Sequence, residues 1–407
     1  MTAFDLFCYG YGVVFVALHI MLTIGIFREW LWDRRSGVSL QLGKNEKQAG
    51  HRVSLIIPIH NESCRIEGLL RSLLAQDFPA EIIFVDDRSD DGSPAMLAQF
   101  AKDAAQLGQC ASIYGGKHDC RVITLAENPG PNYKQHALSV GIAESHGDYL
   151  LFTDGDCEAP PGWISAMVSR MNDPRVGAVI GPVFKKKQGR GFFALYQCFD
   201  HVIRCHYLIG ATGLGAAGGG FGNNLIVSRA ALDSVGGYDA LPPSPTEDAA
   251  LISLIRSQGA YRVRAIAMPD AAVETSAEKT WRDFINQTLR WNNGGLFSPE
   301  LVTRCNYNLL MLIISAGIIA IPLLPFIPGI WPMPAAVLLM MIANTVISCS
   351  LFHTKLPPGG PLNLGYLLTM LFTPVYFTIM TIMGYCGIKT TWKGKKIQTL
   401  QKRRNEA

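Results

Sequence analysis

The chain has 407 residues, of which 49% are hydrophobic and 17% are charged. This length fits two or three ordinary domains, or one large domain with membrane segments, and the hydrophobic excess favours the second arrangement. The formal net charge of +4 is too small to indicate a nucleic-acid-binding protein, so no nucleic acid partner is expected.

The hydrophobic residues gather in four runs. Residues 5–27 are expected to form an uncleaved N-terminal transmembrane anchor, because no Lys or Arg precedes them and no signal-peptidase motif follows. Residues 309–388 contain three further segments, namely Leu309–Ile330, Ala335–Phe352 and Leu364–Ile388. Each run approaches the ~20 residues that cross a bilayer. An integral membrane protein is therefore predicted.

Basic residues predict the orientation. Arg28, Arg34 and Arg35 follow the first run, and the tail at 389–407 is rich in Lys and Arg. Positive charge beside membrane segments marks the cytoplasmic side, so the region between the runs is expected to be cytoplasmic. Three full crossings after it would place the basic tail outside, so one late segment is expected to be re-entrant or interfacial. Several prolines, at 322, 325, 328, 332, 334 and 374, interrupt these segments.

The ten cysteines contain no CxxC pair, which suits free thiols in a reducing compartment. Cys198, His201, Cys205 and His206 are close enough in sequence to suggest a zinc site on a helix. Structural zinc usually draws its ligands from two segments, however. An amphipathic helix at the membrane surface is the favoured interpretation of this stretch.

Residues 45–306 alternate between predicted strands and helices. Strands are expected at RVSLIIPIHNE (52–62), EIIFVDD (81–87), RVITLAE (121–127) and DYLLFTDGD (148–156), with helices at 67–76, 96–107 and 134–145. This alternation predicts a parallel sheet covered by helices on both faces. Ligands of such sheets bind beyond the carboxyl ends of the strands, where Asp86, Asp87, Asp154 and Asp156 would lie.

The stretch FTDGDC carries two of these acids one residue apart. Two like charges repel, and their burial costs several kcal/mol unless a cation or hydrogen-bond donors compensate. A turn or helix cap explains one aspartate but not both. A divalent metal would explain the pair.

Four elements occur in order: VDDRSDD at 85–91, TDGD at 153–156, TED at 246–248 and QTLRW at 287–291. PxxNE follows the first strand, and GGYD precedes TED. Over about residues 50–295 this set resembles the membrane-bound inverting glycosyltransferases of family 2, which have the α/β GT-A fold. The resemblance implies transfer of a sugar from a nucleotide-diphosphate sugar, with a UDP-sugar favoured.

The resemblance assigns roles to residues around the donor. Asp154 and Asp156 would hold Mg²⁺ or Mn²⁺, and Asp156 is the surer ligand. The nucleotide-sugar would contact a larger set: Pro58, Glu62, Asp86, Asp87, Lys134, Asp154, Gln287 and Arg290. The alternatives are a strand-end turn for Asp86 and Asp87, and an unpaired surface lysine for Lys134.

Other roles concern the acceptor. Asp248 resembles the general base, expected to stay ionised because a nearby metal lowers its pKa. Asn223, Asn224, Glu247 and Trp291 would line the acceptor site. The alternatives are helix capping by Thr246 and its two acids, and an ordinary amphipathic helix for QTLRW.

The expected function is transfer of one sugar to a membrane lipid, at the cytoplasmic face of a bacterial inner membrane. A short processive synthase of a surface polysaccharide is the first alternative, although few helices are available to enclose a polymer. A catalytically inactive membrane scaffold is the second.

Overall fold

The computed structural model describes residues 1–42, 51–107, 119–130, 132–189, 191–352, 364–388, 390–392 and 395–396. They form two compact units. The helical unit contains Met1–Arg28, Lys185–Gly218 and Ala277–Ile397, and the sheet unit contains Glu29–Phe184 and Gly219–Ser276. The expected continuous block at 45–306 is thus divided, because 185–218 and 277–306 belong with the hydrophobic helices. The basic tail lies largely outside the described residues.

The sheet unit is built on seven strands in the order β3-β2-β1-β4-β8-β6-β9. Only β8 runs antiparallel to its two neighbours, so the sheet is mostly parallel, as predicted. The strands are β1 (Val53–Ile59), β2 (Glu81–Asp86), β3 (Asp119–Thr124), β4 (Tyr149–Phe152), β6 (Val176–Ile180), β8 (Leu225–Ser228) and β9 (Arg262–Ala265).

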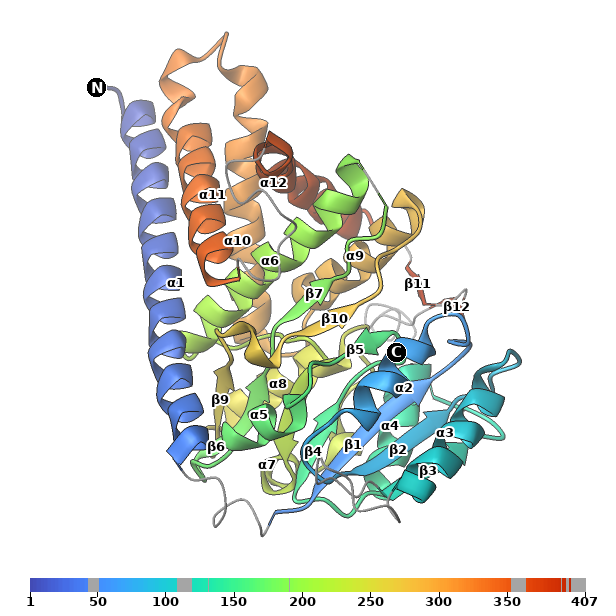
Figure 1. Ribbon diagram of the computed structural model, residues 1–407. Helices are drawn as coiled ribbons and strands as arrows, with labels where there is room; N and C mark the ends of the chain where they lie inside the picture. Colours follow the sequence, from blue (N-terminus) through green and yellow to red (C-terminus); the bar gives the residue numbers. More distant parts are fainter. Residues whose placement is uncertain are drawn as a thin grey trace. The chain divides into compact units, whose positions relative to one another are not determined.

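Helices cover both faces of this sheet (Figure 1). They are α2 (Ile66–Leu74), α3 (Ser93–Leu107), α4 (Tyr133–Ala143), α5 (Trp163–Ser169), α7 (Arg229–Ser234) and α8 (Glu247–Gln258), with short 3₁₀ turns η1 (Tyr238–Ala240) and η2 (Pro269–Ala271). The first three match the predicted helices at 67–76, 96–107 and 134–145.

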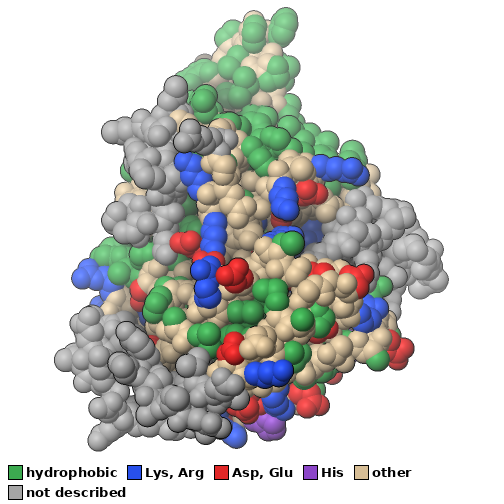
Figure 2. Space-filling view, turned by 45° about the vertical axis from the view of Figure 1, so that its right-hand side comes forward, with side chains coloured by type: hydrophobic (Ala, Val, Ile, Leu, Met, Phe, Trp, Pro, Cys, Tyr) green, Lys and Arg blue, Asp and Glu red, His purple; other side chains and the backbone are tan. Residues whose placement is uncertain are grey.

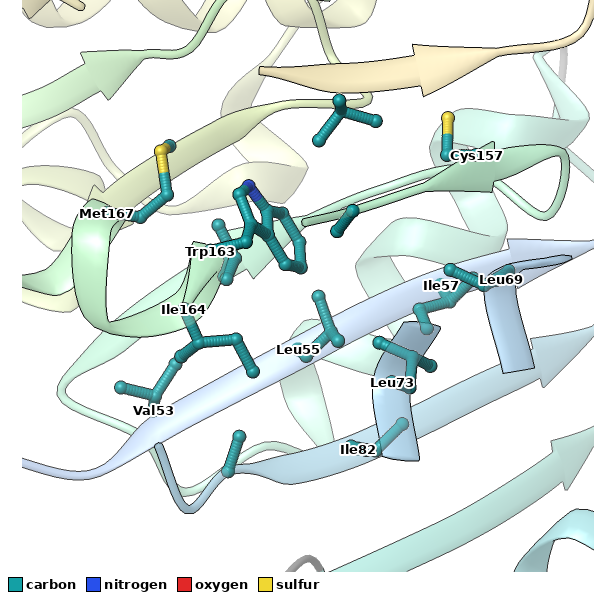
Figure 3. Packing of buried hydrophobic residues seen from close by; sticks show 14 of the residues in the cluster. Val53, Leu55, Ile57, Leu69, Leu73, Ile82, Cys157, Trp163, Ile164 and Met167 are labelled. Carbon is teal, nitrogen blue, oxygen red and sulfur yellow. The ribbon is translucent and has the colours of Figure 1, made fainter. Parts of the chain in front are cut away.

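Strand β1 shows why the sequence forms a two-sided layer. Its alternate residues Val53, Leu55 and Ile57 belong to one buried cluster with side chains of α2 and α5 (Figure 3). Ile56 points the other way, against Gly141 of α4. A strand buried on both faces needs a continuous apolar run rather than an alternating one. Pro58 is tolerated because β4 pairs with β1 only as far as Ile56.

A second, three-stranded sheet has the order β5-β10-β7. Its strands are β5 (Cys157–Glu158), β7 (Val183–Lys185) and β10 (Val273–Thr275), and β5 runs antiparallel to β10. Because β5 follows the TDGD turn directly, this small sheet fixes the position of Asp156.

The helical unit contains α6 (Phe192–Gly213), α9 (Trp281–Leu296), α10 (Leu301–Ile319), α11 (Pro332–Leu351), α12 (Leu364–Tyr385) and the part of α1 (Ala3–Leu42) that precedes Glu29. Short elements complete it: η3 (Ile321–Leu323), η4 (Pro328–Ile330), and an antiparallel pair β11 (Thr391–Trp392) and β12 (Lys395–Lys396). In Figure 1, α1, α10 and α11 run alongside one another.

Four helices in the described part of the chain are long and apolar enough to cross a membrane: α1, α10, α11 and α12. Large apolar side chains such as Val13, Leu309 and Leu339 lie at exposed positions on them, and hydrophobic side chains gather in the upper part of the view in Figure 2. Pro322, Pro325 and Pro328 fall in or beside η3 and η4, and Pro332 and Pro334 fall in the first turn of α11. Together they form the bend between α10 and α11. Pro374 lies inside α12, which continues past it.

Helix α6 differs from its prediction. Every residue from Tyr196 to Ile203 is buried, which covers two full turns and hence all sides of the helix. Cys198, His201, Cys205 and His206 are all among the buried residues. The predicted amphipathic surface helix is therefore wrong, because neighbouring helices cover its polar positions too. Among the described residues, no group of three or more His, Cys, Asp or Glu side chains could hold a metal, so zinc is not supported here.

Helix α1 is longer than the predicted anchor, and its end belongs to the sheet unit. Glu29 accepts hydrogen bonds from Arg264 Nε (3.1 Å) and the Ala265 N–H (2.9 Å). Asp33, fully buried, accepts from Arg170 Nε at 2.9 Å and from the N–H groups of Ala267 and Met268 at 3.0 and 2.9 Å. The last turns of α1 are therefore part of the core of the sheet unit.

Replacing Asp33 with alanine is expected to destabilise the protein by about 3 kcal/mol, because it leaves the buried Arg170 guanidinium with one carboxylate fewer and two N–H groups without an acceptor. Thermal unfolding of the purified full chain in detergent measures this. The control is Asp173→Ala, which breaks an ion pair with Arg175, whose side chain is 67% exposed, and should cost less than about 1 kcal/mol. Equal effects of the two substitutions would contradict the prediction.

Candidate active site

The carboxyl ends of β1 and β2 are joined at the first pair of acids. Asp86 is the last residue of β2, and the Asp87 N–H donates to the Ile59 carbonyl at 2.8 Å. Both side chains are buried. Asp87 bonds Arg88 Nε at 2.8 Å and Asn128 Nδ2 at 3.0 Å. Asp86 accepts from the Ser89 N–H at 3.3 Å, so it also makes the strand-end turn that was the alternative interpretation.

The PxxNE loop packs on this turn. Asn61 adopts φ 55°, a left-handed conformation that asparagine tolerates better than most residues. Its N–H donates to Ser89 Oγ at 2.9 Å, and its Oδ1 accepts from the Asp90 N–H at 2.9 Å. The Glu62 N–H donates to Ser93 Oγ at 2.8 Å. The loops that follow β1 and β2 therefore form one rigid edge.

The TDGD turn follows β4 at the same edge. A Cβ atom on Gly155 would lie 2.8 Å from Ile59 Cδ1 and 3.0 Å from Glu62 Cγ, so the turn needs glycine to approach the PxxNE loop. Asp156 accepts from Thr275 Oγ1 at 3.0 Å, and Arg65 Nη1 lies 4.0 Å from the same carboxylate. The side chains of Asp154 and Asp156 are 31% and 18% exposed, so both are accessible to a ligand.

Lys134 links this turn to the TED motif. Its Nζ lies 2.7 Å from Asp154 Oδ1 and 3.5 Å from Glu247 Oε1. Burial opposes the charge of Lys134, but the carboxylates of Asp154 and Glu247 outweigh it and raise the pKa above its ordinary value. Lys134 is therefore a charged residue inside the site, and the surface-lysine alternative is wrong.

Asp248 lies in the first turn of α8. Its Oδ2 accepts from the Gly222 N–H at 2.7 Å, and its Oδ1 accepts from the Ala249 N–H at 2.8 Å. A Cβ atom on Gly222 would come within 3.0 Å of Asp248 Cβ. The glycine-rich run GAAGGGFGNN at 215–224 therefore lets its backbone approach the carboxylate. Thr246 precedes the helix but makes no side-chain cap bond, so the capping alternative does not hold for Thr246.

Burial, followed by the neighbouring charge of Glu247, raises the pKa of Asp248 to about 6, although Lys134 acts in the opposite direction. The lowered pKa expected for Asp248 from the sequence depended on a nearby metal. The groups of the protein alone raise this pKa. A carboxylate with this pKa is mostly ionised at neutral pH and still able to take a proton, which is what a general base needs. A small cavity borders it, lined by Leu138, Phe152, Leu225, Tyr238 and Leu251 together with Gly222 and Glu247.

The two adjacent asparagines have different environments. Asn223 is partly exposed and donates to Cys157 Sγ at 3.4 Å. Asn224 is fully buried. Its Oδ1 accepts from Trp163 Nε1 at 2.9 Å, and its Nδ2 donates to the carbonyls of Pro182 and Ala271 at 2.9 and 2.8 Å. Asn224 cannot bind an acceptor hydroxyl from there, so its predicted role is wrong and we assign it to the scaffold.

The QTLRW residues lie in α9 of the helical unit. Gln287 Nε2 donates to Glu278 Oε1 at 2.7 Å. Arg290 and Trp291 are partly buried, and the Trp291 ring packs against side chains of α6. Their roles towards the donor and acceptor remain predictions.

Asp154 and Asp156 are accessible oxygen ligands of the kind that a divalent cation prefers, although Lys134 and Arg65 already compensate part of their charge. Two carboxylates do not fill the coordination shell of Mg²⁺ or Mn²⁺, and no group of three or more ligating side chains occurs among the described residues. A cation here would need oxygens from a substrate such as a diphosphate.

Four residues near the site were not predicted. Arg65 lies near Asp156, Thr275 bonds it, Asn128 bonds Asp87, and the Gly222 N–H bonds Asp248. Arg65 follows Glu62 by three residues, a spacing that places both on one turn and could have indicated it. Thr275 and Asn128 come from distant segments, and no local pattern indicates them. Gly222 directly precedes the predicted Asn223 in the glycine-rich run at 215–224, which indicates this region.

The acid limb of the pH–activity profile should report Asp248. Activity is expected to fall as the pH drops through the pKa of Asp248, which burial and Glu247 raise, because a protonated base cannot accept the proton. Glu247→Gln removes a neighbouring negative charge, so it should move the limb to lower pH by roughly one unit. Lys134→Met removes a positive charge and should move the limb the other way. Profiles of kcat/KM against pH measure both shifts. If neither variant moves the acid limb, the limb reports the titration of a group other than Asp248.

The acidic residues beyond the carboxyl ends of the parallel strands lie at the edge where α/β folds bind their ligands, and Asp248 adds a partly buried carboxylate at the start of α8. Residues 54–236 match the glycosyl transferase family 2 model, and residues 149–386 match the model of glycosyl transferase family group 2. The second match covers more than half of the chain, so the protein belongs to the family 2 glycosyltransferases.

Individual relatives agree with this family. The chain is 25% identical over 252 residues to the beta-monoglucosyldiacylglycerol synthase of Synechocystis, covering 60% of this chain and 48% of that protein. It is 26% identical over 269 residues to the poly-beta-1,6-N-acetyl-D-glucosamine synthase of Staphylococcus epidermidis, covering 63% and 57%. The match spans between 39% and 66% of the length of these curated relatives.

The fold is GT-A, as predicted. The mannosyltransferase PcManGT of Pyrobaculum calidifontis, solved in complex with GDP-Man and Mn²⁺, superposes with a TM-score of 0.50 at 21% identity. The match covers 91% of this chain and 99% of that one.

Proposed function

We propose that the protein transfers one sugar from a nucleotide-diphosphate sugar, with UDP-sugar favoured, to a membrane lipid, with inversion of the anomeric centre. One observation carries the proposal: Lys134 bridges the TDGD turn and the TED motif, 2.7 Å from Asp154 and 3.5 Å from Glu247. The acids of the TDGD turn, proposed to face the donor, and the TED motif with its candidate base Asp248 thus belong to one charged cluster. A direct displacement of the diphosphate by the acceptor oxygen needs these two groups close together.

In the proposed reaction Asp248 takes the proton of the acceptor hydroxyl. The acceptor oxygen then forms a bond to the anomeric carbon, while the bond from that carbon to the diphosphate oxygen breaks. The nucleoside diphosphate leaves with the bonding electron pair. The Gly222 and Ala249 N–H groups hold the carboxylate of Asp248 in one orientation, so its proton-accepting oxygen stays in place. Attack opposite to the leaving group inverts the centre.

The donor would be held at the edge formed by β1, β2 and β4. Asp86 and Asp87 are proposed to bind the base and ribose, while Pro58 and Glu62 shape the loop beside them. The Lys134 ammonium, with Gln287 and Arg290 as further candidates, would bind the diphosphate. Mg²⁺ or Mn²⁺ held by Asp154 and Asp156 would neutralise the charge that develops on the diphosphate. The metal in the mannosyltransferase complex supports this choice.

The proposed acceptor is amphiphilic. The described part of the chain has four helices able to cross a membrane, and only residues 292–300 separate QTLRW from the first of the late ones, α10. A short connection of this kind keeps Trp291 close to the bilayer surface, where the hydroxyl or phosphate of a lipid lies. Asn223 and Glu247 are proposed to line the acceptor site as well. The lipid product named for the Synechocystis relative supports this acceptor class.

Membranes incubated with a panel of labelled nucleotide sugars and then partitioned between water and organic solvent test the proposal. We expect label in the organic phase, on a product that carries one sugar or very few. Label mainly in a long water-soluble chain would favour the processive alternative, which the Staphylococcus relative supports. Absence of transfer with every donor would favour the inactive scaffold.

The sidedness is proposed from charge. Arg28, Arg34 and Arg35 follow the first apolar run, so the sheet unit is placed at the cytoplasmic face of a bacterial inner membrane. Among the four candidate spans, α12 is the most enclosed by protein, with 56% of its apolar window buried. We propose α12 as the segment that does not cross fully, because protein contacts can replace lipid around it.

A further inference from the structure

We propose that Asp200 and Arg204 of α6 are positioning residues that fix the indole of Trp291 in the QTLRW motif. The proposal rests on the proposed function only for the part that Trp291 plays towards the acceptor. The contact itself is independent of that role. All of the residues concerned lie in the helical unit.

Asp200 and Arg204 form an ion pair one helical turn apart. Arg204 Nε lies 2.7 Å and its Nη2 3.1 Å from the two carboxylate oxygens of Asp200. Asp200 is fully buried, while the Arg204 side chain is 16% exposed. This bidentate geometry fixes the plane of the guanidinium. A buried pair of this kind is costly to form, which makes a role in orientation more fitting than one in stability.

The oriented guanidinium lies close to two aromatic rings. Arg204 Cζ lies 5.1 Å from the centroid of Trp291 on α9 and 5.4 Å from that of Phe377 on α12. Both distances are within the range of cation–π attraction. His201, on the same helix, meets the Trp291 ring edge-on, with centroids 5.5 Å apart and an interplanar angle of 82°. Two side chains of α6 therefore contact the indole from different directions.

Other contacts hold the α9 backbone on each side of Trp291. Thr288 Oγ1 hydrogen-bonds Tyr376 on α12. Asn292 Nδ2 donates to the Met380 carbonyl at 3.1 Å, and its Oδ1 accepts from Tyr307 at 2.8 Å. These bonds fix the position of α9, and the α6 side chains then set the rotamer of the indole. The two tasks are separable by substitution.

The charge of Arg204 is already balanced by Asp200, so this arginine suits a fixed role under an aromatic ring better than capture of an anionic substrate. Removal of the Arg204 side chain is therefore expected to weaken binding of the acceptor and to leave binding of the donor unchanged. The lipid acceptor KM should rise about tenfold in Arg204→Met, which is the value of a partly desolvated cation–π contact, while the donor KM stays the same.

The experiment compares Arg204→Met, Arg204→Lys and Asp200→Asn with Tyr376→Phe in the purified full chain. Tyr376→Phe removes a contact between α9 and α12 without touching Trp291, and so controls for stability. We expect a raised acceptor KM in the first three, smallest in Arg204→Lys because it keeps the positive charge. An unchanged acceptor KM in Arg204→Met, with a fall in Tm matching Tyr376→Phe, would overturn the proposal.

A second readout needs no activity. The chain is labelled with 5-fluorotryptophan, and the ¹⁹F resonance of Trp291 is identified from its absence in Trp291→Phe. This resonance should shift or broaden in Arg204→Met and Asp200→Asn but not in Tyr376→Phe. An unmoved resonance would overturn the positioning role. A moved resonance in a protein that transfers no sugar to lipid would keep the positioning role and refute the proposed function instead.

Discussion

Replacing Asp248 with asparagine is expected to lower turnover by about 10²–10⁴-fold, the usual contribution of a positioned general base. Asparagine has nearly the same shape and its oxygen can still accept the Gly222 N–H bond, but it cannot accept the acceptor's proton. The affinity for the nucleoside diphosphate should therefore change little. Initial rates with saturating donor, together with UDP or GDP titration calorimetry, measure the two quantities.

Asp233→Asn is a suitable control, because Asp233 is an exposed acid on α7 and its loss should leave turnover unchanged. If nucleotide affinity collapses together with turnover in Asp248→Asn, Asp248 is a ligand of the nucleotide or the metal and the base is a different residue.

Asp156→Asn is expected to reduce activity by about 10³-fold or more, since the neutralisation of a departing diphosphate accounts for several kcal/mol. The substituted amide can keep the hydrogen bond from Thr275, so the fold should persist. Excess EDTA should inactivate the wild-type protein, and added Mn²⁺ or Mg²⁺ should restore it. Mn²⁺ binding in the presence of UDP, followed by electron paramagnetic resonance, gives a readout besides turnover.

Asp154→Asn makes a graded comparison, because Lys134 already neutralises Asp154 at 2.7 Å and its carboxylate is the less certain ligand. We expect weaker Mn²⁺ binding than in the wild type but stronger binding than in Asp156→Asn. Full turnover of the wild-type protein in excess EDTA would refute the metal site.

The first four strands could be predicted because their information is local. β1 and β2 are continuous apolar runs that end in acids, and the intervening helices have clear apolar spacing. The same locality put Asp86, Asp154 and Asp156 at one edge. β8 was not predicted: it runs antiparallel between β4 and β6, and its short sequence carries no signal for its partner.

The predictions that were wrong share one physical cause: each side chain is buried by residues that are distant in the sequence. Asn224 looks like a ligand in a glycine-rich run, but Trp163, Pro182 and Ala271 use its amide. The polar residues of α6 suggested a surface helix because its neighbours could not be inferred. The pKa of Asp248 likewise depends on burial and on Lys134, which is over a hundred residues away in the chain. A pattern within one segment does not show which residues from distant segments will bury a side chain or place a charge beside it.

The division of the chain has a practical consequence for protein engineering. The described chain passes between the two units at 28/29, 184/185, 218/219 and 276/277, and the sheet unit takes part of its core from the last turns of α1. A soluble fragment limited to the predicted domain at 45–306 would lack Glu29 and Asp33, and so would leave Arg264 and Arg170 without these carboxylates. It would also carry α6 and α9 without the apolar helices that pack against them. Chimaeras that exchange donor specificity between relatives should instead exchange 29–184 and 219–276 as two inserts, so that Glu29 and Asp33 move together with Arg264 and Arg170, which bind them.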